Sequence, residues 1–166
     1  MPYGGVFLFK IGDKIMYPMH GAGIIESVKE MEIQGKKQDY FVIQLSIANM
    51  QIMIPLQKLA KLGIRPVENQ IKLEEVLVVF HDGESDELLP WKERYKTNMD
   101  KIKSGEIQQG AEVVRDLMRK SIEKALNTSE KQMLNNAKNI FVSELVLIKG
   151  CTENQANEML MTKKIS

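Results

Sequence analysis

The residues best placed for chemistry in this sequence surround Trp91, the only tryptophan in the chain. Trp91 follows Pro90 and is itself followed by three cations, Lys92, Arg94 and Lys96. An aromatic side chain among cations at the start of a helix is typical of a minor-groove wedge, in which cations hold phosphates and the ring unstacks a base step. The alternative is that the indole packs into a helical bundle or against another domain, as large aromatic side chains usually do.

A second group of cations lies further along the chain, on segments with a helical pattern. Its members are Arg115, Arg119, Lys120, Lys124, Lys131 and Lys138. Acidic residues are interleaved with them, so a solvated helix face explains most of this pattern, and phosphate contact stays open for a subset.

Catalytic motifs are missing from the sequence. It has no phosphate-binding glycine loop, no HExxH and no nucleophile elbow. The two histidines, His20 and His81, lie in predicted loops without candidate partners, and we interpret His20 as a turn residue. We therefore expect no catalytic residue, no metal site, no cofactor and no small-molecule substrate.

Composition also limits the possible classes. The single thiol, Cys151, excludes an internal disulfide and a cysteine zinc cluster, and no apolar run approaches the length of a membrane span. We therefore expect a cytoplasmic protein without a membrane partner. The net charge of +1 is unevenly distributed, because residues 91–166 carry 14 basic and ten acidic side chains. This bias predicts only weak binding to a polyanion without help from another protein.

The first half of the 166-residue chain has the pattern of short β-strands. Runs of Val, Ile, Tyr and Phe are separated by Gly, Asn and Pro, and Gly35 in the QGKK segment indicates a hairpin turn. These features predict a small, strongly bent antiparallel sheet or barrel. The expected strands are 14–17, 23–33, 39–45, 51–54 and 64–67.

The segment 72–80 has apolar residues at helical spacing, although it is also compatible with a strand. We expect it to be a short helix that closes the barrel and completes an N-terminal domain of residues 1–80. The acidic segment 81–90 contains Gly and Pro and lacks periodicity, so it is the expected linker between domains.

The pattern after Pro90 is helical, which predicts a multidomain α+β protein with a C-terminal bundle over residues 91–166. Helices are expected from Trp91 to about Ser104, over about 108–126, from Ser129, and after Thr152. Ser129 with Gln132, and Thr152 with Gln155, have the spacing of capping boxes. On the second helix, we expect Val114, Leu117, Met118, Ser121 and Ala125 to share the buried face.

An ordered set of motifs along nearly the whole chain resembles a bacterial family, the CarD and CdnL transcription regulators. The N-terminal pieces are FKIGDKIMYPMHGAGIIE (9–26), QGKK (34–37), DYFVI (39–43), IMIP (52–55) and LGIR (62–65). The C-terminal pieces are WKERYKTNM (91–99), KIKSGE (101–106), AEVVRDL (111–117), TSEKQML (128–134) and SEL (143–145). Chance does not explain agreement over so many separate pieces.

The resemblance implies a Tudor-like N-terminal domain that binds the β subunit of RNA polymerase. The same module occurs in the transcription–repair coupling factor. In the family, a strand edge makes the polymerase contact. Its counterparts in this chain are Met31, Ile52, Met53, Ile54 and Pro55, with Ile43 in support.

The resemblance also implies that the helical domain contacts promoter DNA at the upstream fork of the transcription bubble, from the minor-groove side. The family's wedge tryptophan matches Trp91, and Glu93 departs from the family pattern because a basic residue is common there. The expected DNA-contacting residues are Trp91, Lys92, Arg94, Lys96, Met99 and Lys131.

These observations predict a non-enzymatic regulator that binds polymerase, contacts promoter DNA weakly and without base specificity, and stabilises the open complex. In a bacterial cell it would associate with the nucleoid through polymerase. The alternative is a protein-interaction adaptor whose helical domain binds another protein, with Trp91 as an interface anchor.

Overall fold

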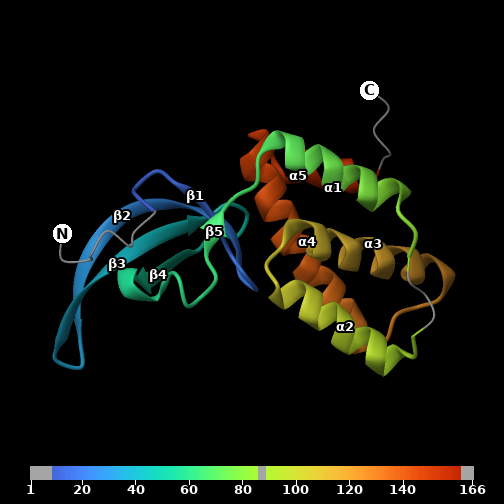
Figure 1. The fold of residues 1–166 in the computed structure, drawn as a ribbon, viewed down its shortest axis with the longest axis horizontal. Helices are drawn as coiled ribbons and strands as arrows, with labels where there is room; N and C mark the ends of the chain where they lie inside the picture. Colours follow the sequence, from blue (N-terminus) through green and yellow to red (C-terminus); the bar gives the residue numbers. More distant parts are fainter. Residues whose placement is uncertain (1–8, 86–88, 162–166) are drawn as a thin grey trace.

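The computed structural model describes residues 9–85 and 89–161, which form a five-stranded sheet followed by five α-helices (Figure 1). The sheet has the order β4-β3-β2-β1-β5 with antiparallel neighbours, and a register shift between Ile25 and Ser27 interrupts the β2–β3 ladder. The predicted α+β organisation is confirmed, with an open sheet in place of a closed barrel. The strands are β1 (Lys14–Tyr17), β2 (Gly21–Ile33), β3 (Lys36–Leu45), β4 (Gln51–Pro55) and β5 (Arg65–Pro66).

The long β2–β3 hairpin turns through Gln34 and Gly35, as the QGKK segment predicts. Both residues have positive φ angles, of 53° and 78°, and Ile33 pairs with Lys36 across the turn. Positive φ at both central residues is typical of the two-residue turn that matches the twist of a hairpin. Because the turn is this tight, β3 begins at Lys36, three residues before the predicted start.

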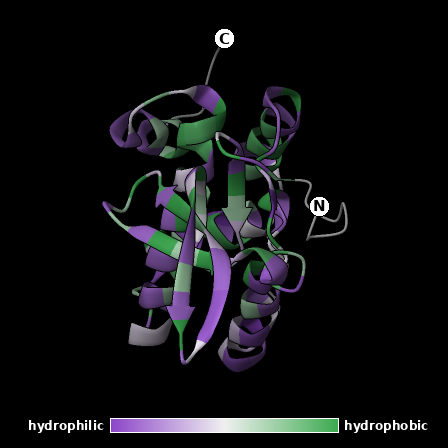
Figure 2. Ribbon diagram, turned by 90° about the vertical axis from the view of Figure 1, so that its left-hand side faces the viewer, coloured by the Kyte–Doolittle hydropathy of each residue, from purple (hydrophilic) through white to green (hydrophobic). Residues whose placement is uncertain are grey.

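One face of the sheet carries the core of the N-terminal domain, and Figure 2 shows polar and apolar stretches along the strands that form it. Side chains alternate between the two faces of a strand, so every second residue of β3 and β4 points inward. The 3-10 turn η1 (Leu56–Lys58) covers the open end of this core. The buried cluster comprises Ile15, Ile25, Phe41, Ile43, Ile54, Leu56, Leu59 and Ile64.

The helices are α1 (Gln70–Asp82), α2 (Trp91–Lys103), α3 (Ile107–Glu123), α4 (Thr128–Lys149) and α5 (Glu153–Met161). The capping box of Thr152 and Gln155 is confirmed by reciprocal hydrogen bonds of 2.9 and 3.1 Å. The other predicted capping box is wrong. Asn127 is the N-cap of α4, and its side chain accepts a 2.8 Å hydrogen bond from the Glu130 amide.

The buried face of α3 is shorter than its sequence pattern indicates. Val114 and Leu117 are fully buried, but Ser121 is exposed, as is Ala125 beyond the helix. The reason is that α3 ends at Glu123 and its last turn lies outside the core, where Ile122 is 85% exposed.

The segment 72–80 is helical, but it does not close the sheet, so this expectation is wrong. Leu73, Val76 and Phe80 belong to the core that α3 and α4 form. The helices α3 and α4 cover the apolar face of this helix, so its side chains are buried in the helical core. We propose that the helical domain begins with α1. Residues 86–88 of the expected acidic linker lie outside the described residues.

Candidate nucleic-acid and partner interface

Trp91 is the first residue of α2 and has 45% of its surface exposed. Pro90 precedes it as the N-cap, with φ −56° and ψ 154°, and its carbonyl accepts the first helical hydrogen bond from the Arg94 amide at 2.9 Å. Proline fixes φ near this value and has no N–H to lose, so it starts the helix at a defined residue. The structure therefore places Trp91, half-exposed, at the start of a helix.

The start of α2 is fastened to the start of α4 by an ion pair. The Arg94 guanidinium donates from Nε to Glu130 Oε2 and from Nη2 to Oε1, both at 2.9 Å, while Nη1 lies 3.4 Å from the Leu89 carbonyl. The Glu130 side chain is only 3% exposed. This hydrogen bonding to Glu130, partly offset by burial, raises the pKa of Arg94. Arg94 thus fixes the start of α2, which carries Trp91, and has few donors left for a phosphate.

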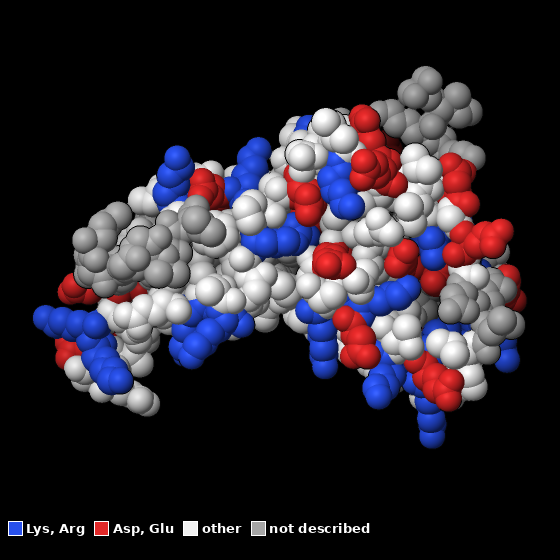
Figure 3. Space-filling view, in the orientation of Figure 1, with Lys and Arg blue, Asp and Glu red and all other residues white. Residues whose placement is uncertain are grey.

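Three of the expected DNA-contacting lysines are free. Lys92, Lys96 and Lys131 are exposed, and none of them forms an ion pair within residues 9–85 and 89–161. Because Glu130 binds Arg94, Lys131 lies on the turn of α4 next to the start of α2. Figure 3 shows Lys and Arg side chains projecting from this edge of the helical domain, with carboxylates among them. The mixed signs indicate a surface that contacts a polyanion weakly.

Met99 is less exposed than Trp91. It is partly buried and packs against the core of the helical bundle, whereas Trp91 lies at the free end of α2. Two turns of helix separate them, so Met99 supports α2 from inside and presents little surface for a ligand. Glu93 is exposed beside the lysines, as expected from the sequence.

Four of the expected polymerase-contacting residues lie on the edge strand β4, while Ile43 lies on β3 and Met31 on β2, and together they point to both faces of the sheet. Ile54 is 3% exposed and Ile43 is fully buried, and both belong to the sheet core. Met53 is 38% exposed and pairs with Val42 of β3 on the opposite face. Alternation along the strand therefore selects Met53 as the outward apolar residue.

Met31, Ile52 and Pro55 complete the expected set. Met31 lies opposite Gln38 far along the β2–β3 hairpin and is half-buried, and Pro55 lies opposite Tyr40. Ile52 packs partly against the sheet core. The structure therefore gathers Met31, Met53 and Pro55 on the face away from that core.

Arg115 and Arg119 have a structural role that sequence patterns did not reveal. Arg119 donates to the carbonyls of Gly83 and His81 at 2.6 and 3.2 Å, and Arg115 donates to the Val79 carbonyl at 3.1 Å. The last carbonyls of a helix lack intrahelical partners and carry partial negative charge, so cations stabilise them. These two arginines therefore cap α1.

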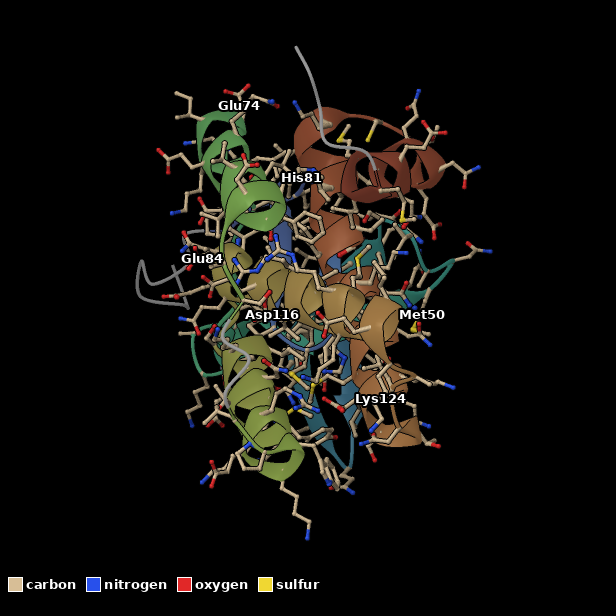
Figure 4. All side chains as sticks on the ribbon, turned by 90° about the vertical axis from the view of Figure 1, so that its right-hand side faces the viewer. Met50, Glu74, His81, Glu84, Asp116 and Lys124 are labelled. Atoms are coloured by element: carbon tan, nitrogen blue, oxygen red, sulfur yellow. The ribbon has the colours of Figure 1, made fainter. Side chains whose placement is uncertain are left out.

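The end of α1 is also tied to α5. The His81 Nε2 atom donates a 2.9 Å hydrogen bond to the Met159 carbonyl, and Figure 4 shows His81 on the α5 side of α1. The second histidine, His20, is exposed in the β1–β2 turn, and its ring contacts the ring of Tyr17 in a tilted arrangement. Both histidines have structural contacts.

One hollow, of about 390 Å³, lies between two turns of the sheet domain and the helices α4 and α5, and its ionisable lining residues are His20 and Glu153. In the described part of the chain, no group of three or more His, Cys, Asp or Glu residues is placed to hold a metal ion. No described helix is both long and apolar enough to span a membrane.

Comparisons with known proteins agree with this two-part architecture. Residues 9–68 match the model of the CarD-like/TRCF RID domain, and residues 75–161 match that of the CarD C-terminal domain. A curated relative from Bacillus subtilis (strain 168), "Putative transcription factor YdeB", is 60% identical over 148 residues, which cover 89% of this chain and 97% of the relative.

One similar solved structure is the solution NMR structure of the 72-residue N-terminal domain of Myxococcus xanthus CarD. It is 25% identical, covers 40% of this chain and 89% of its own, and has a TM-score of 0.32. The two family matches together extend over both the sheet and the helices, and the relative is similar over almost its whole length. The chain belongs to the CarD family.

Proposed function

We propose that this protein binds the β subunit of bacterial RNA polymerase through its sheet domain and stabilises the promoter open complex through Trp91. A CarD-family chain with the RID module is a transcription-factor homologue whose N-terminal domain implies interaction with RNA polymerase. The finer proposal rests on one observation: Trp91 is a half-exposed indole at the start of a helix that a buried ion pair holds in place.

The polymerase contact is assigned to the β4 edge and its outward face. An edge strand offers unpaired backbone groups to a partner strand, and β4 is at one end of the five-strand order. Met53 and Met31 supply the apolar side chains on that face, while Ile43 and Ile54 shape the strand from the core side. Methionine suits such a surface because its flexible side chain adapts to a partner.

The DNA contact is assigned to the free end of α2. Trp91 stacks on a base at the upstream fork, and Lys92, Lys96 and Lys131 neutralise phosphates around it. Arg94 holds the wedge in place, since Glu130 occupies its donors. Glu93 repels phosphate, which keeps affinity for free DNA low.

The mechanism follows from tethering and preferential binding. Polymerase binding raises the local concentration of the helical domain at the promoter, so that weak DNA contacts are sufficient. A stacked indole requires an unstacked base step, which the open complex offers and the closed complex does not, so the protein favours opening. A preference of about 1.4 kcal/mol would shift the equilibrium about tenfold.

The test is the lifetime of open complexes formed by bacterial RNA polymerase with wild-type protein, Trp91→Ala or Ile122→Ala. Ile122 is the matched control, because it is an exposed apolar residue on another helix. We expect wild type and the control to lengthen the lifetime, and Trp91→Ala to lose this effect while binding polymerase equally well. If Trp91→Ala lengthens the lifetime as much as wild type does, the proposed role of Trp91 as a wedge is wrong. Polymerase binding by wild type without any effect would favour the adaptor function.

A further inference from the structure

A buried ion pair joins the sheet domain to the helical domain. Arg65, at the start of β5, donates from Nη1 to Glu144 Oε2 at 2.7 Å and from Nη2 to Oε1 at 2.8 Å. The Glu144 side chain, in the middle of α4, is 1% exposed, and it also accepts the Glu68 amide at 2.9 Å. A charged carboxylate buried to this extent requires such a set of donors. Both carboxylate oxygens of Glu144 therefore accept hydrogen bonds from the sheet side of the interface.

The same guanidinium reaches a third segment. Its Nε donates to the Gly105 carbonyl at 2.8 Å, in the turn between α2 and α3. Gly105 has a φ of +73°, and a Cβ there would lie 2.8 Å from Cγ of Pro18, which belongs to the β1–β2 turn. Arg65 therefore connects β5 to α4 and to the end of the helix that carries Trp91. We call the contacts of Arg65 with Glu144 and Gly105 the clasp.

Ser143, next to Glu144, makes a second set of contacts across the interface. Its hydroxyl accepts the Ala22 amide at 2.8 Å, and its carbonyl accepts the Ser46 hydroxyl at 2.8 Å. Met16, Ala22 and Leu147 form a small buried cluster beside these hydrogen bonds. Directional contacts at several separated points fix an orientation, whereas a single chain connection between two domains normally permits relative motion.

The clasp lies between the two surfaces that the proposed function uses. The β4 edge is at the opposite end of the sheet order from β5, and Trp91 is at the opposite end of α2 from Gly105. A wedge acts only where it meets the fork in the correct orientation, so a loose connection would reduce its effective concentration there. The position of Trp91 relative to polymerase therefore depends on the clasp.

We infer that Arg65 and Glu144 are positioning residues for open-complex stabilisation, which hold the helical domain at a fixed orientation to the polymerase-bound sheet. This inference rests on the proposed function. Neither residue belongs to the outward face of β4 or to the exposed start of α2, and both act through the relative placement of those two surfaces.

The first test measures orientation directly. Spin labels at Lys58→Cys and Ile122→Cys, on a Cys151→Ser background, report the distance between the domains, since both sites are exposed and one lies in each domain. We expect one narrow distance distribution in the otherwise wild-type protein and a broad one in Arg65→Ala. A narrow distribution in Arg65→Ala would overturn the inference. This readout does not involve promoter opening, so it is independent of the proposed function.

The second test measures function in the same variants. Arg65→Ala should bind polymerase within about twofold of wild type but lose at least half of the increase in open-complex lifetime. Arg65→Lys, which keeps the charge but not the two-pronged geometry, should be intermediate. An undiminished lifetime effect in Arg65→Ala would overturn the inference. No lifetime effect in wild type would instead mean that the proposed function is wrong.

A covalent rescue separates positioning from loss of stability. A Cβ built at Gly21 lies 3.6 Å from Ser143 Cβ, within the range that a disulfide spans. Gly21 has a φ of +120°, so a cysteine there is strained, but this strain is common to the oxidised and the reduced protein and cancels in their comparison. Gly21→Cys and Ser143→Cys are therefore added to Arg65→Ala on the Cys151→Ser background. The oxidised protein should regain the lifetime effect, and the same protein after reduction should lose it again. Equal effects in both states would contradict a positioning role.

Discussion

Glu130 accepts two 2.9 Å hydrogen bonds from the guanidinium of Arg94, which lies one helical turn after Trp91. The pair is nearly buried, with side-chain exposures of 14% and 3%. Two rigid donors on one carboxylate restrict rotation as well as distance, so the start of α2 has a defined orientation on α4. The exposed indole is consequently carried by a fixed helix end.

Loss of this ion pair should destabilise the helical domain. Glu130→Ala leaves the Arg94 charge without a partner, and we expect the free energy of unfolding to fall by about 3 kcal/mol. The pKa of Arg94 is higher in the folded protein than in the unfolded chain. The stability that the ion pair contributes is therefore fully present at any pH below the pKa of unfolded arginine, and it is lost only as the pH rises through the higher pKa of the folded state. Urea denaturation measures the change.

The matched control for Glu130→Ala is Glu112→Ala. Glu112 pairs with Lys101 at 3.3 Å, and both side chains are more exposed, at 21% and 28%. A pair that lies nearer the surface contributes less, about 0–1 kcal/mol. Equal losses from the two substitutions would contradict the assignment of Glu130 as the anchor of α2.

The free lysines should contribute to DNA binding through charge alone. Lys92→Ala, Lys96→Ala and Lys131→Ala should each reduce the slope of log K against log salt by about 1, because each removes one phosphate contact. Binding to a forked promoter fragment at several salt concentrations measures this slope. Lys58→Ala, in the sheet domain, is the control and should leave it unchanged. The DNA assignment fails for any lysine whose removal leaves the slope at the wild-type value.

The arginines that cap α1 should contribute to stability and not to DNA binding. Arg119→Met removes hydrogen bonds to the Gly83 and His81 carbonyls and should lower the free energy of unfolding by about 1–3 kcal/mol. Its salt slope for DNA should equal that of wild type. A reduced slope at unchanged stability would instead assign Arg119 to phosphate contact.

The outward face of β4 should determine polymerase affinity. Met53→Asp places a charge on this face and should weaken binding by about 2 kcal/mol or more, while the fold is retained because Met53 is outside the core. Val28→Asp is the control, since Val28 is 43% exposed on β2, which is separated from β4 by β3. Titration of labelled protein with polymerase gives both affinities. Equal losses would mean that the contact is not specific to β4.

Local sequence signals predicted the elements that depend on near neighbours. Gly35 and the alternation around it located the hairpin, and Thr152 with Gln155 located the start of α5, because each signal acts within four residues. The start of α4 was misplaced because Asn127, Thr128 and Ser129 all favour an N-cap position. Only the geometry of the turn selects Asn127.

Long-range partners could not be predicted in this way. Arg94 and Glu130 are 36 residues apart, and Arg65 and Glu144 are 79 apart, so neither pair leaves a periodic pattern. The apolar spacing of Leu73, Val76 and Phe80 indicated a buried face but not the surface that covers it. The role of Trp91 stays a prediction, and its signal is local, because the cationic side chains around it are adjacent in sequence.

The most direct measurement of the central claim compares the affinity of this protein for polymerase in two states, before opening and in the open complex. Linkage requires that a protein which shifts promoter opening by some factor binds the open complex more tightly by the same factor. We predict that wild type binds the open complex about tenfold more tightly and that Trp91→Ala binds both states equally. Equal affinities for wild type, or an unchanged preference in Trp91→Ala, would contradict the claim.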